Sequence, residues 1–355
     1  MKRARILELD GLRGAAASIV VIAHFFGETP HGTTALAAAW IGVDVFFVLS
    51  GFLIGTIILD NVDTPRFFRV FYSKRAVRIF PIYGVTCFVT LILVALTRGH
   101  PWSDKPLSPL VYVFFLQNIV LSFWGGGGVW LLPTWTLAVE ERFYLILPLL
   151  IYFTRPARRA PVLIALWLAA PLFRWATFDA NPMAAWTLLP SRMDLLIAGV
   201  IAALFQKHFD PAKHLQLSRL VPVICAFLLA IFGGAEHFYP RFEKTFTLIN
   251  PTLLSVGIGS FLLSIINGAP EGARWRSSVL RYLGKISYAL YLVHQPISGL
   301  LHGLILNEAP DVGTPAQIAV TLLAIACSVG VAALSWEILE KPCLAWYRGD
   351  YERSP

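Results

Sequence analysis

Long apolar stretches, separated by short polar ones, recur along the whole chain. A helix needs about 20 predominantly apolar residues to cross the hydrocarbon core of a bilayer. Ten stretches approach or exceed that length, at residues 8–27, 36–60, 78–97, 132–154, 160–177, 188–206, 219–236, 246–267, 282–306 and 315–338. The pattern predicts an all-α fold, a polytopic membrane protein with a bundle of about ten transmembrane helices.

The composition agrees with this prediction, because 57% of the 355 residues are hydrophobic and only 14% are charged. Soluble domains carry about 25% charged residues. We expect one transmembrane domain over residues 1–343 and a short cytoplasmic tail over residues 344–355. The longest stretch between spans, 98–131, holds an apolar segment at 109–123 that is too short to cross comfortably. We expect this segment to be re-entrant or interfacial, or to form a loop that lies on lipid headgroups.

The formal net charge of +8 could suggest nucleic acid as a partner, but the distribution of charge points to topology. When all Lys and Arg except Arg13 and Arg142 are assigned to alternate sides of the membrane, 21 fall on one side and six on the other, among them Arg174 and Arg192. The positive-inside rule then places both termini in the cytoplasm. We therefore expect a multi-pass protein of the inner (cytoplasmic) membrane, with membrane lipids and no nucleic acid as partners.

Polar residues within the spans carry most of the functional information. Arg13 and His24 are eleven residues apart, so at about 100° per residue they emerge from nearly the same helix face. Such groups are costly in hydrocarbon and persist mostly where they are used. Glu140 and Asp44 reach a depth similar to that of His24, and a carboxylate beside a neutral imidazole is a usual general-base arrangement. The alternative for His24 is a histidine hydrogen-bonded within a packed bundle.

Other polar residues within or beside the spans are candidates to line a cavity or to contact an acceptor. Asp10 and Arg13 are three residues apart and can pair. For His294, a structural role and a functional role are equally open. Gly51 and Gly55 form a small-xxx-small pair, which favours a packing seam. The candidates for cavity lining are Asp10, Ser50, Trp135, Tyr144, Arg192, Asp194, Tyr291 and His294; of these, Ser50, Trp135 and Tyr144 are candidate oxyanion donors.

The loop expected between the second and third spans combines basic and aromatic residues. Arg75 and Arg78 can share a helix face, and Lys74 adds charge beside interleaved Phe and Tyr residues. This combination suits a nucleotide that carries several phosphates. The alternative is topogenic charge in contact with anionic lipid headgroups. The four cysteines have no metal-site or disulfide spacing, and we expect no metal site and no permanently bound cofactor.

A set of short motifs, in order along nearly the whole chain, resembles the membrane acyltransferase 3 family. The motifs are LDGLRGAAASIVVIAHFF (9–26), GVDVFFVLSGFLIG (42–55), KRAVRIFPIY (74–83), TWTLAVEERFYLILP (134–148), RMDLLIAG (192–199), LGKISYALYLVHQPI (283–297) and EKP (340–342). The resemblance implies transfer of an acyl group, most often acetyl, from cytoplasmic acyl-CoA to a hydroxyl of a glycan sugar or its lipid-linked precursor.

The resemblance also assigns roles to particular residues. It makes Arg13 and His24 the key pair of the first helix, Arg75 and Arg78 contacts to coenzyme A, and Glu140 the glutamate of its motif. Some members carry a fused extracytoplasmic SGNH esterase-like domain; we expect none here, so that the bundle delivers the acyl group itself or to a separate partner.

We therefore predict an O-acyltransferase, with acyl-CoA as donor and a glycan or lipid-linked saccharide as acceptor. The predicted catalytic residues are His24, Glu140 and Asp44, and the predicted acyl-CoA contacts are Arg13, Lys74, Arg75 and Arg78. The alternative is a transporter or flippase of lipid-linked sugars, which would also suit ten spans with buried charges.

Overall fold

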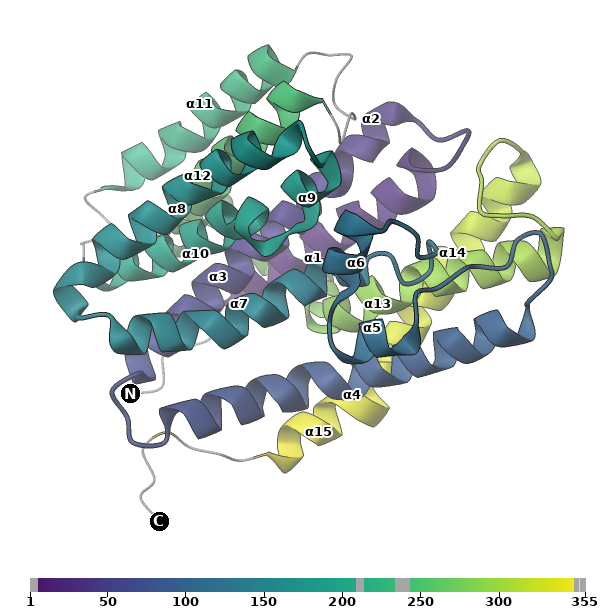
Figure 1. Cartoon of the computed structure of the whole chain (residues 1–355), viewed down its shortest axis with the longest axis horizontal. Coiled ribbons are helices and arrows are strands. Elements are labelled where there is room, and N and C mark those ends of the chain that lie inside the picture. The colour runs from purple at the N-terminus through teal and green to yellow at the C-terminus, as the bar shows by residue number, and fades with distance from the viewer. Residues whose placement is uncertain (1–5, 209–213, 234–242, 348–350, 352–355) are drawn as a thin grey trace. The chain divides into compact units, whose positions relative to one another are not determined.

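The computed structural model describes residues 6–208, 214–233, 243–347 and 351, which contain helices and no strand (Figure 1). Eight helical segments in this part of the chain are long and apolar enough to cross a membrane. Their main helices are α1 (Leu7–Ile22), α3 (Ile41–Asn61), α4 (Phe67–Leu96), α8 (Pro156–Phe178), α10 (Leu189–His208), α12 (Lys244–Ile266), α13 (Ser278–Leu306) and α14 (Pro315–Ser335). The predicted all-α membrane fold is confirmed.

Two further long helices, α7 (Thr134–Phe153) and α11 (Leu215–Gly233), occupy the two remaining predicted spans. The last three residues of the predicted span 219–236, and residues 348–350 and 352–355 of the predicted tail, lie outside the described residues. Shorter elements connect the long helices: η1 (Ala23–Gly27), α2 (Thr34–Ala37), η2 (Ala38–Trp40), α5 (Pro109–Val113), α6 (Gln117–Phe123), α9 (Pro182–Thr187), η4 (Pro270–Arg276), η5 (Trp336–Glu340) and α15 (Lys341–Trp346).

The described chain divides into two compact units. Unit 1 comprises residues 6–18, 40–60 and 139–285, and unit 2 comprises residues 19–39, 61–138 and 286–351 where they are described. In unit 1, α8, α10, α11 and α12 pack side by side (Figure 1). In unit 2, η5 and α15 pack against α4.

Glycines allow a very close helix contact in unit 1. A Cβ atom on Gly51 of α3 would collide with the backbone carbonyl of Leu196 in α10, and one on Gly55 would lie 3.1 Å from the Cα of Val200. Helices approach this closely only where no side chain intervenes. The prediction that this glycine pair forms a packing seam is confirmed.

Helix α4 begins at Phe67, eleven residues before the span predicted at 78–97, so much of the expected loop is helical. Phe67, Val70 and Phe71 are each at most 3% exposed. Their spacing of three and four residues places them on one helix face. The prediction from hydropathy placed the boundary too late because the charged residues between these positions lower the average over the segment.

The stretch between α4 and α7 folds into two short helices, α5 and α6, instead of one longer segment. They meet at Phe115, whose φ of 52° lies in the left-handed region. The Asp104 carboxylate accepts hydrogen bonds from the N–H groups of Val129, at 2.8 Å, and Trp130, at 3.1 Å. These bonds fix the loop that follows Gly125–Gly128 at the start of α7.

Candidate active site

His24 lies in a π-helical turn at the end of the first span. The turn, η1, is closed by a hydrogen bond of 2.9 Å from the N–H of Glu28 to the carbonyl of Ala23. Such turns insert one residue into a helix and are frequent at functional sites. In unit 2 this turn brings His24 against His294 of α13, with 2.7 Å between His24 Nδ1 and His294 Nε2.

The hydrogen bonds of the His pair determine which nitrogens carry protons when both rings are neutral. His294 Nδ1 lies 3.1 Å from the carbonyl oxygen of Leu290, which can only accept, so Nδ1 is the protonated nitrogen. His294 Nε2 then accepts the bond from His24 Nδ1–H. The remaining ring nitrogen of His24, Nε2, is therefore unprotonated, which is the state that a general base requires.

His294 is held rigidly among other side chains of unit 2. Its side chain is 0% exposed, and its ring centroid lies 5.9 Å from those of Tyr291 and Phe25. The Tyr291 hydroxyl is 3.0 Å from the Pro133 carbonyl and 2.9 Å from the Thr136 hydroxyl. The structure thus brings together three predicted site residues, His24, Tyr291 and His294, in one unit.

Sequence reasoning expected a carboxylate beside His24, and the structure places a second imidazole at its Nδ1 instead. The carboxylate that lies close is Glu28, whose Oε2 is 3.9 Å from His24 Nε2. Glu28 was not predicted as a site residue. The sequence signal that could have identified Glu28 is its spacing of four residues from His24, because residues four apart share a helix face.

Glu140 of α7 lies in unit 1, in a cluster of its own. It accepts hydrogen bonds from the Ser50 hydroxyl, at 2.8 Å, and from the Tyr144 hydroxyl, at 3.1 Å. Both predicted oxyanion donors of this unit thus donate to a carboxylate. The prediction that Glu140 and His24 share a cavity stays a prediction.

Four buried charged residues form two ion pairs in unit 1. Arg192 lies 3.3 Å from Asp44, and Arg174 lies 2.7 Å from Asp194. Each of these side chains is at most 2% exposed. Both arginines lie within helices of unit 1, and each is paired with an acid of another helix. The catalytic role predicted for Asp44 stays a prediction, and its partner in the structure is Arg192.

Neutral groups supply further hydrogen bonds to both arginines. The Arg192 guanidinium donates to the Trp186 carbonyl at 2.7 Å and lies 3.7 Å from the Trp186 ring centroid. Arg174 donates to the Ser191 carbonyl and to the Thr252 hydroxyl. Such bonds lower the cost of burying the ions, although Asp44 Oδ2 and Arg174 Nε have no hydrogen-bond partner among the described residues.

The other predicted residues lie at several places. Asp10 and Arg13 are half-buried in the part of α1 that belongs to unit 1, and their pairing stays a prediction. Trp135 lines a small cavity of unit 2 beside the glycine loop. Lys74, Arg75 and Arg78 are half-buried in the first turns of α4.

His31 and Asp311 join the segment that follows η1 to the loop that follows α13 in unit 2. The Asp311 carboxylate accepts from the backbone N–H of His31 at 3.0 Å and lies 2.6 Å from its ring Nδ1. Burial acts to raise the pKa of Asp311, but the hydrogen bonds from His31 outweigh it and hold this pKa below its ordinary value. The pair ties together the ends of the two helices that carry His24 and His294.

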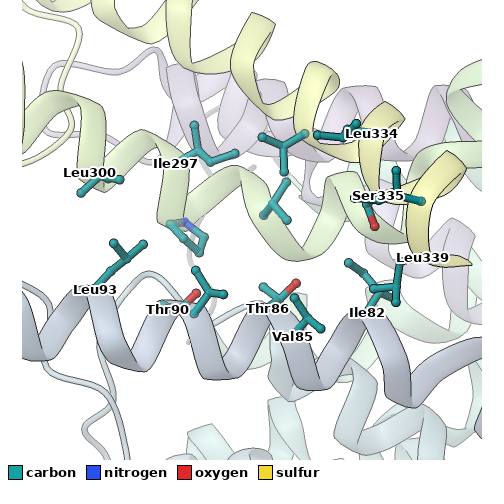
Figure 2. A pocket seen from close by; sticks show the side chains of 15 residues that line it. Ile82, Val85, Thr86, Thr90, Leu93, Ile297, Leu300, Leu334, Ser335 and Leu339 are labelled. Carbon is teal, nitrogen blue, oxygen red and sulfur yellow. The ribbon is translucent and has the colours of Figure 1, made fainter.

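Figure 2 shows a cavity of about 340 Å³ in unit 2, bounded by α4, α13, α14 and η5. Its lining is aliphatic except for three hydroxyls, those of Thr86, Thr90 and Ser335. No ionisable side chain lines it, so it is separate from the His pair. Across the described ranges, no group of three or more His, Cys, Asp or Glu residues is arranged to hold a metal ion.

The fold defines a class of protein: a polytopic helical membrane protein, here with a hydrogen-bonded pair of histidines in one of its units. The acyltransferase-domain model of the acyltransferase 3 family matches residues 6–336. The chain belongs to this family, as its motifs predicted.

Three relatives align with nearly the whole of this chain. The chain is 28% identical to the putative peptidoglycan O-acetyltransferase YrhL of Bacillus subtilis, covering 94% of this chain and 54% of the relative. It is 27% identical to acyltransferase MdmB of Streptomyces mycarofaciens, covering 96% and 92%, and 26% identical to the peptidoglycan O-acetyltransferase OatA of Listeria monocytogenes, covering 96% and 56%. The chain thus spans about half the length of YrhL and OatA. No solved structure matches it.

Proposed function

We propose that this protein is an integral-membrane O-acyltransferase that moves an acyl group, by default acetyl, from cytoplasmic acyl-CoA to a hydroxyl of a saccharide on the outer side of the inner membrane. Membership of the acyltransferase 3 family supports the reaction class. The observation that carries the mechanism is the His24–His294–Leu290 hydrogen-bond chain, which gives His24 an unprotonated Nε2. A transporter or flippase would leave the thioester of acyl-CoA intact, so the transfer assay below distinguishes the two functions.

In the proposed reaction, His24 Nε2 removes the proton of the acceptor hydroxyl while the hydroxyl oxygen attacks the thioester carbonyl carbon. The tetrahedral intermediate collapses with cleavage of the carbon–sulfur bond. The new ester forms, and the proton passes from His24 to the leaving thiolate of coenzyme A. The imidazolium that exists in between is stabilised by His294 Nε2 at His24 Nδ1 and by the Glu28 carboxylate at 3.9 Å.

The donor site is proposed at the first turns of α4. Lys74, Arg75 and Arg78 supply the charge for the phosphates of coenzyme A, because guanidinium groups bind phosphate in bidentate fashion. The pantetheine arm then extends past Arg13 toward His24. Glu140 and Asp44 remain proposed as the acids that support the reaction.

For the acceptor we propose a glycan or lipid-linked saccharide, with peptidoglycan as the first to test. The names of YrhL and OatA support this choice. The aligned region covers only about half of each of those two relatives, so the acceptor has to be tested with the present chain.

The test is transfer of labelled acetyl from acetyl-CoA to purified peptidoglycan fragments by the protein in nanodiscs. His24→Ala and His24→Gln should each lower kcat by at least about 100-fold, since general-base catalysis contributes about 10²–10⁴-fold. His302→Gln is the matched control: His302 is also buried in α13, but it lies against Thr321 and away from the reaction. Normal transfer by either His24 variant, with the control active, would exclude His24 as the base.

A further inference from the structure

The first turns of α4 present a face that is aromatic and basic at once. At about 100° per residue, Phe67, Phe71, Lys74, Arg75 and Arg78 fall within roughly one third of the helix circumference. The two Phe side chains are each 1% exposed, and the three cations are half-buried. This face is therefore directed toward other parts of unit 2.

Described residues near the C-terminus contact α4, and Tyr351 contacts this face. Both η5 and α15 pack against α4 in unit 2 (Figure 1). Beyond them, the Tyr351 ring lies 6.4 Å from the Phe67 ring, at an interplanar angle of 26°. The Lys74 ammonium lies 4.5 Å from the centre of the Tyr351 ring. An aromatic ring thus stands directly beside the cations.

The electrostatic surroundings of Tyr351 also place its ring close to the cations of α4. Burial raises the pKa of its phenol, and the positive charge of Arg75 acts in the opposite direction. Tyr351 is thus partly desolvated and close to Arg75 as well as to Lys74. Its ring and these two cations form one microenvironment.

A nucleotide needs these two kinds of group together. A purine base stacks on aromatic faces, and its phosphates pair with Arg and Lys. A phospholipid headgroup would use the cations but has no planar base for an aromatic ring. Coenzyme A carries an adenine base and three phosphates at the end remote from its thioester. The ring of Tyr351 therefore favours a nucleotide over a lipid.

We propose that Tyr351, packed on the buried Phe67 and beside Lys74, forms the stacking wall of a subsite for the adenine nucleotide of the acyl-CoA donor. This inference rests on the proposed function for the identity of the donor. It adds that Tyr351 belongs to the donor site and contributes to affinity for the nucleotide end of the donor.

The experiment measures equilibrium binding of labelled acetyl-CoA to the full-length protein in nanodiscs, with adenosine 3′,5′-bisphosphate as competitor. The competitor carries only the nucleotide end of the donor. Tyr351→Ala should weaken both ligands by the same factor, about 5- to 150-fold, as loss of one base–aromatic stack predicts. Tyr351→Phe should bind as the wild type does. The control is Trp346→Ala, because Trp346 is an 83% exposed aromatic residue in the preceding helix.

The possible outcomes separate this inference from the proposed function. If Tyr351→Ala binds both ligands as the wild type does while Arg75→Ala weakens them, the stacking wall is wrong and the donor site stands. Tighter binding by Tyr351→Ala would mean that the C-terminal segment blocks the site, which also overturns the inference. If the wild type binds neither ligand, the proposed donor fails and the subsite with it.

Discussion

Replacement of His294 tests whether the second imidazole orients the first. In His294→Leu, the buried Nδ1–H of His24 loses the acceptor that lies 2.7 Å away in the wild type. In His294→Gln, the side-chain amide oxygen provides an acceptor at the same position in the chain. The structure therefore predicts a large loss of activity in the first variant and a smaller one in the second.

The magnitude follows from the number of groups that the substitution leaves unsatisfied. A single buried donor without its partner costs about 1–3 kcal/mol. The neutral ring can avoid that cost by moving its proton to Nε2, but it then ceases to be a base. At about 1.36 kcal/mol for each factor of ten in rate, kcat should fall by about 5- to 150-fold in His294→Leu. The KM for acetyl-CoA should be unchanged, because His294 is completely buried.

The assay is the initial rate of labelled acetyl transfer as a function of acetyl-CoA concentration. His302→Leu serves as the control, because it also removes a buried imidazole from α13. His302→Leu should lower the Tm and leave kcat unchanged. The reasoning would be refuted if His294→Leu kept wild-type kcat, or if His294→Gln and His302→Leu lost as much kcat as His294→Leu.

The remaining predictions concern stability. Arg174→Leu leaves Asp194, which is 0% exposed, without its cation, at a cost of about 3–5 kcal/mol. At about 2–4 °C per kcal/mol, the Tm of Arg174→Leu in detergent should fall by about 6–20 °C. The double variant Arg174→Leu/Asp194→Leu should show a smaller fall in Tm. Equal falls in Tm for the two variants would contradict the ion pair. Asp311→Asn should lower Tm at neutral pH by removing the carboxylate that His31 binds. Because the pKa of Asp311 is depressed in the folded protein, its contribution is full above the unfolded pKa of about 3.9 and disappears as the pH falls through the lower folded value. The Tm difference from wild type should therefore begin to shrink below about pH 4 and keep shrinking on further acidification, and a difference that stays constant as the pH falls would show that the carboxylate's charge is not its cause.

The membrane-spanning helices were predictable because the bilayer imposes a local requirement. Each segment must bury its own backbone polar groups in about 20 apolar residues, and that requirement is visible in the order of residues alone. The start of α4 was misjudged because the packing of Phe67 and Phe71, rather than hydropathy, extends the helix beyond the apolar core. Packing depends on neighbours that are remote in the sequence.

The candidate site, like the fold, was predictable from the sequence only in part. Spacing within the first predicted span singled out His24, but its partner, His294, is 270 residues away along the chain. Their positions in apolar spans also marked Asp44 and Arg192 as unusual, but the sequence did not show that the two residues pair with one another. Glu28 went unnoticed because a single acid at the end of a span is common.

The sequence by itself determined the class of fold, the family and the choice of His24, because hydropathy, motif order and spacing within one helix are properties of neighbouring residues. The tertiary structure alone decided which nitrogen of His24 carries the proton, which acids neutralise Arg174 and Arg192, and which ring lies beside Lys74. Those choices depend on hydrogen bonds and charges between helices, whose energies fall steeply with distance and exist only once the helices have packed.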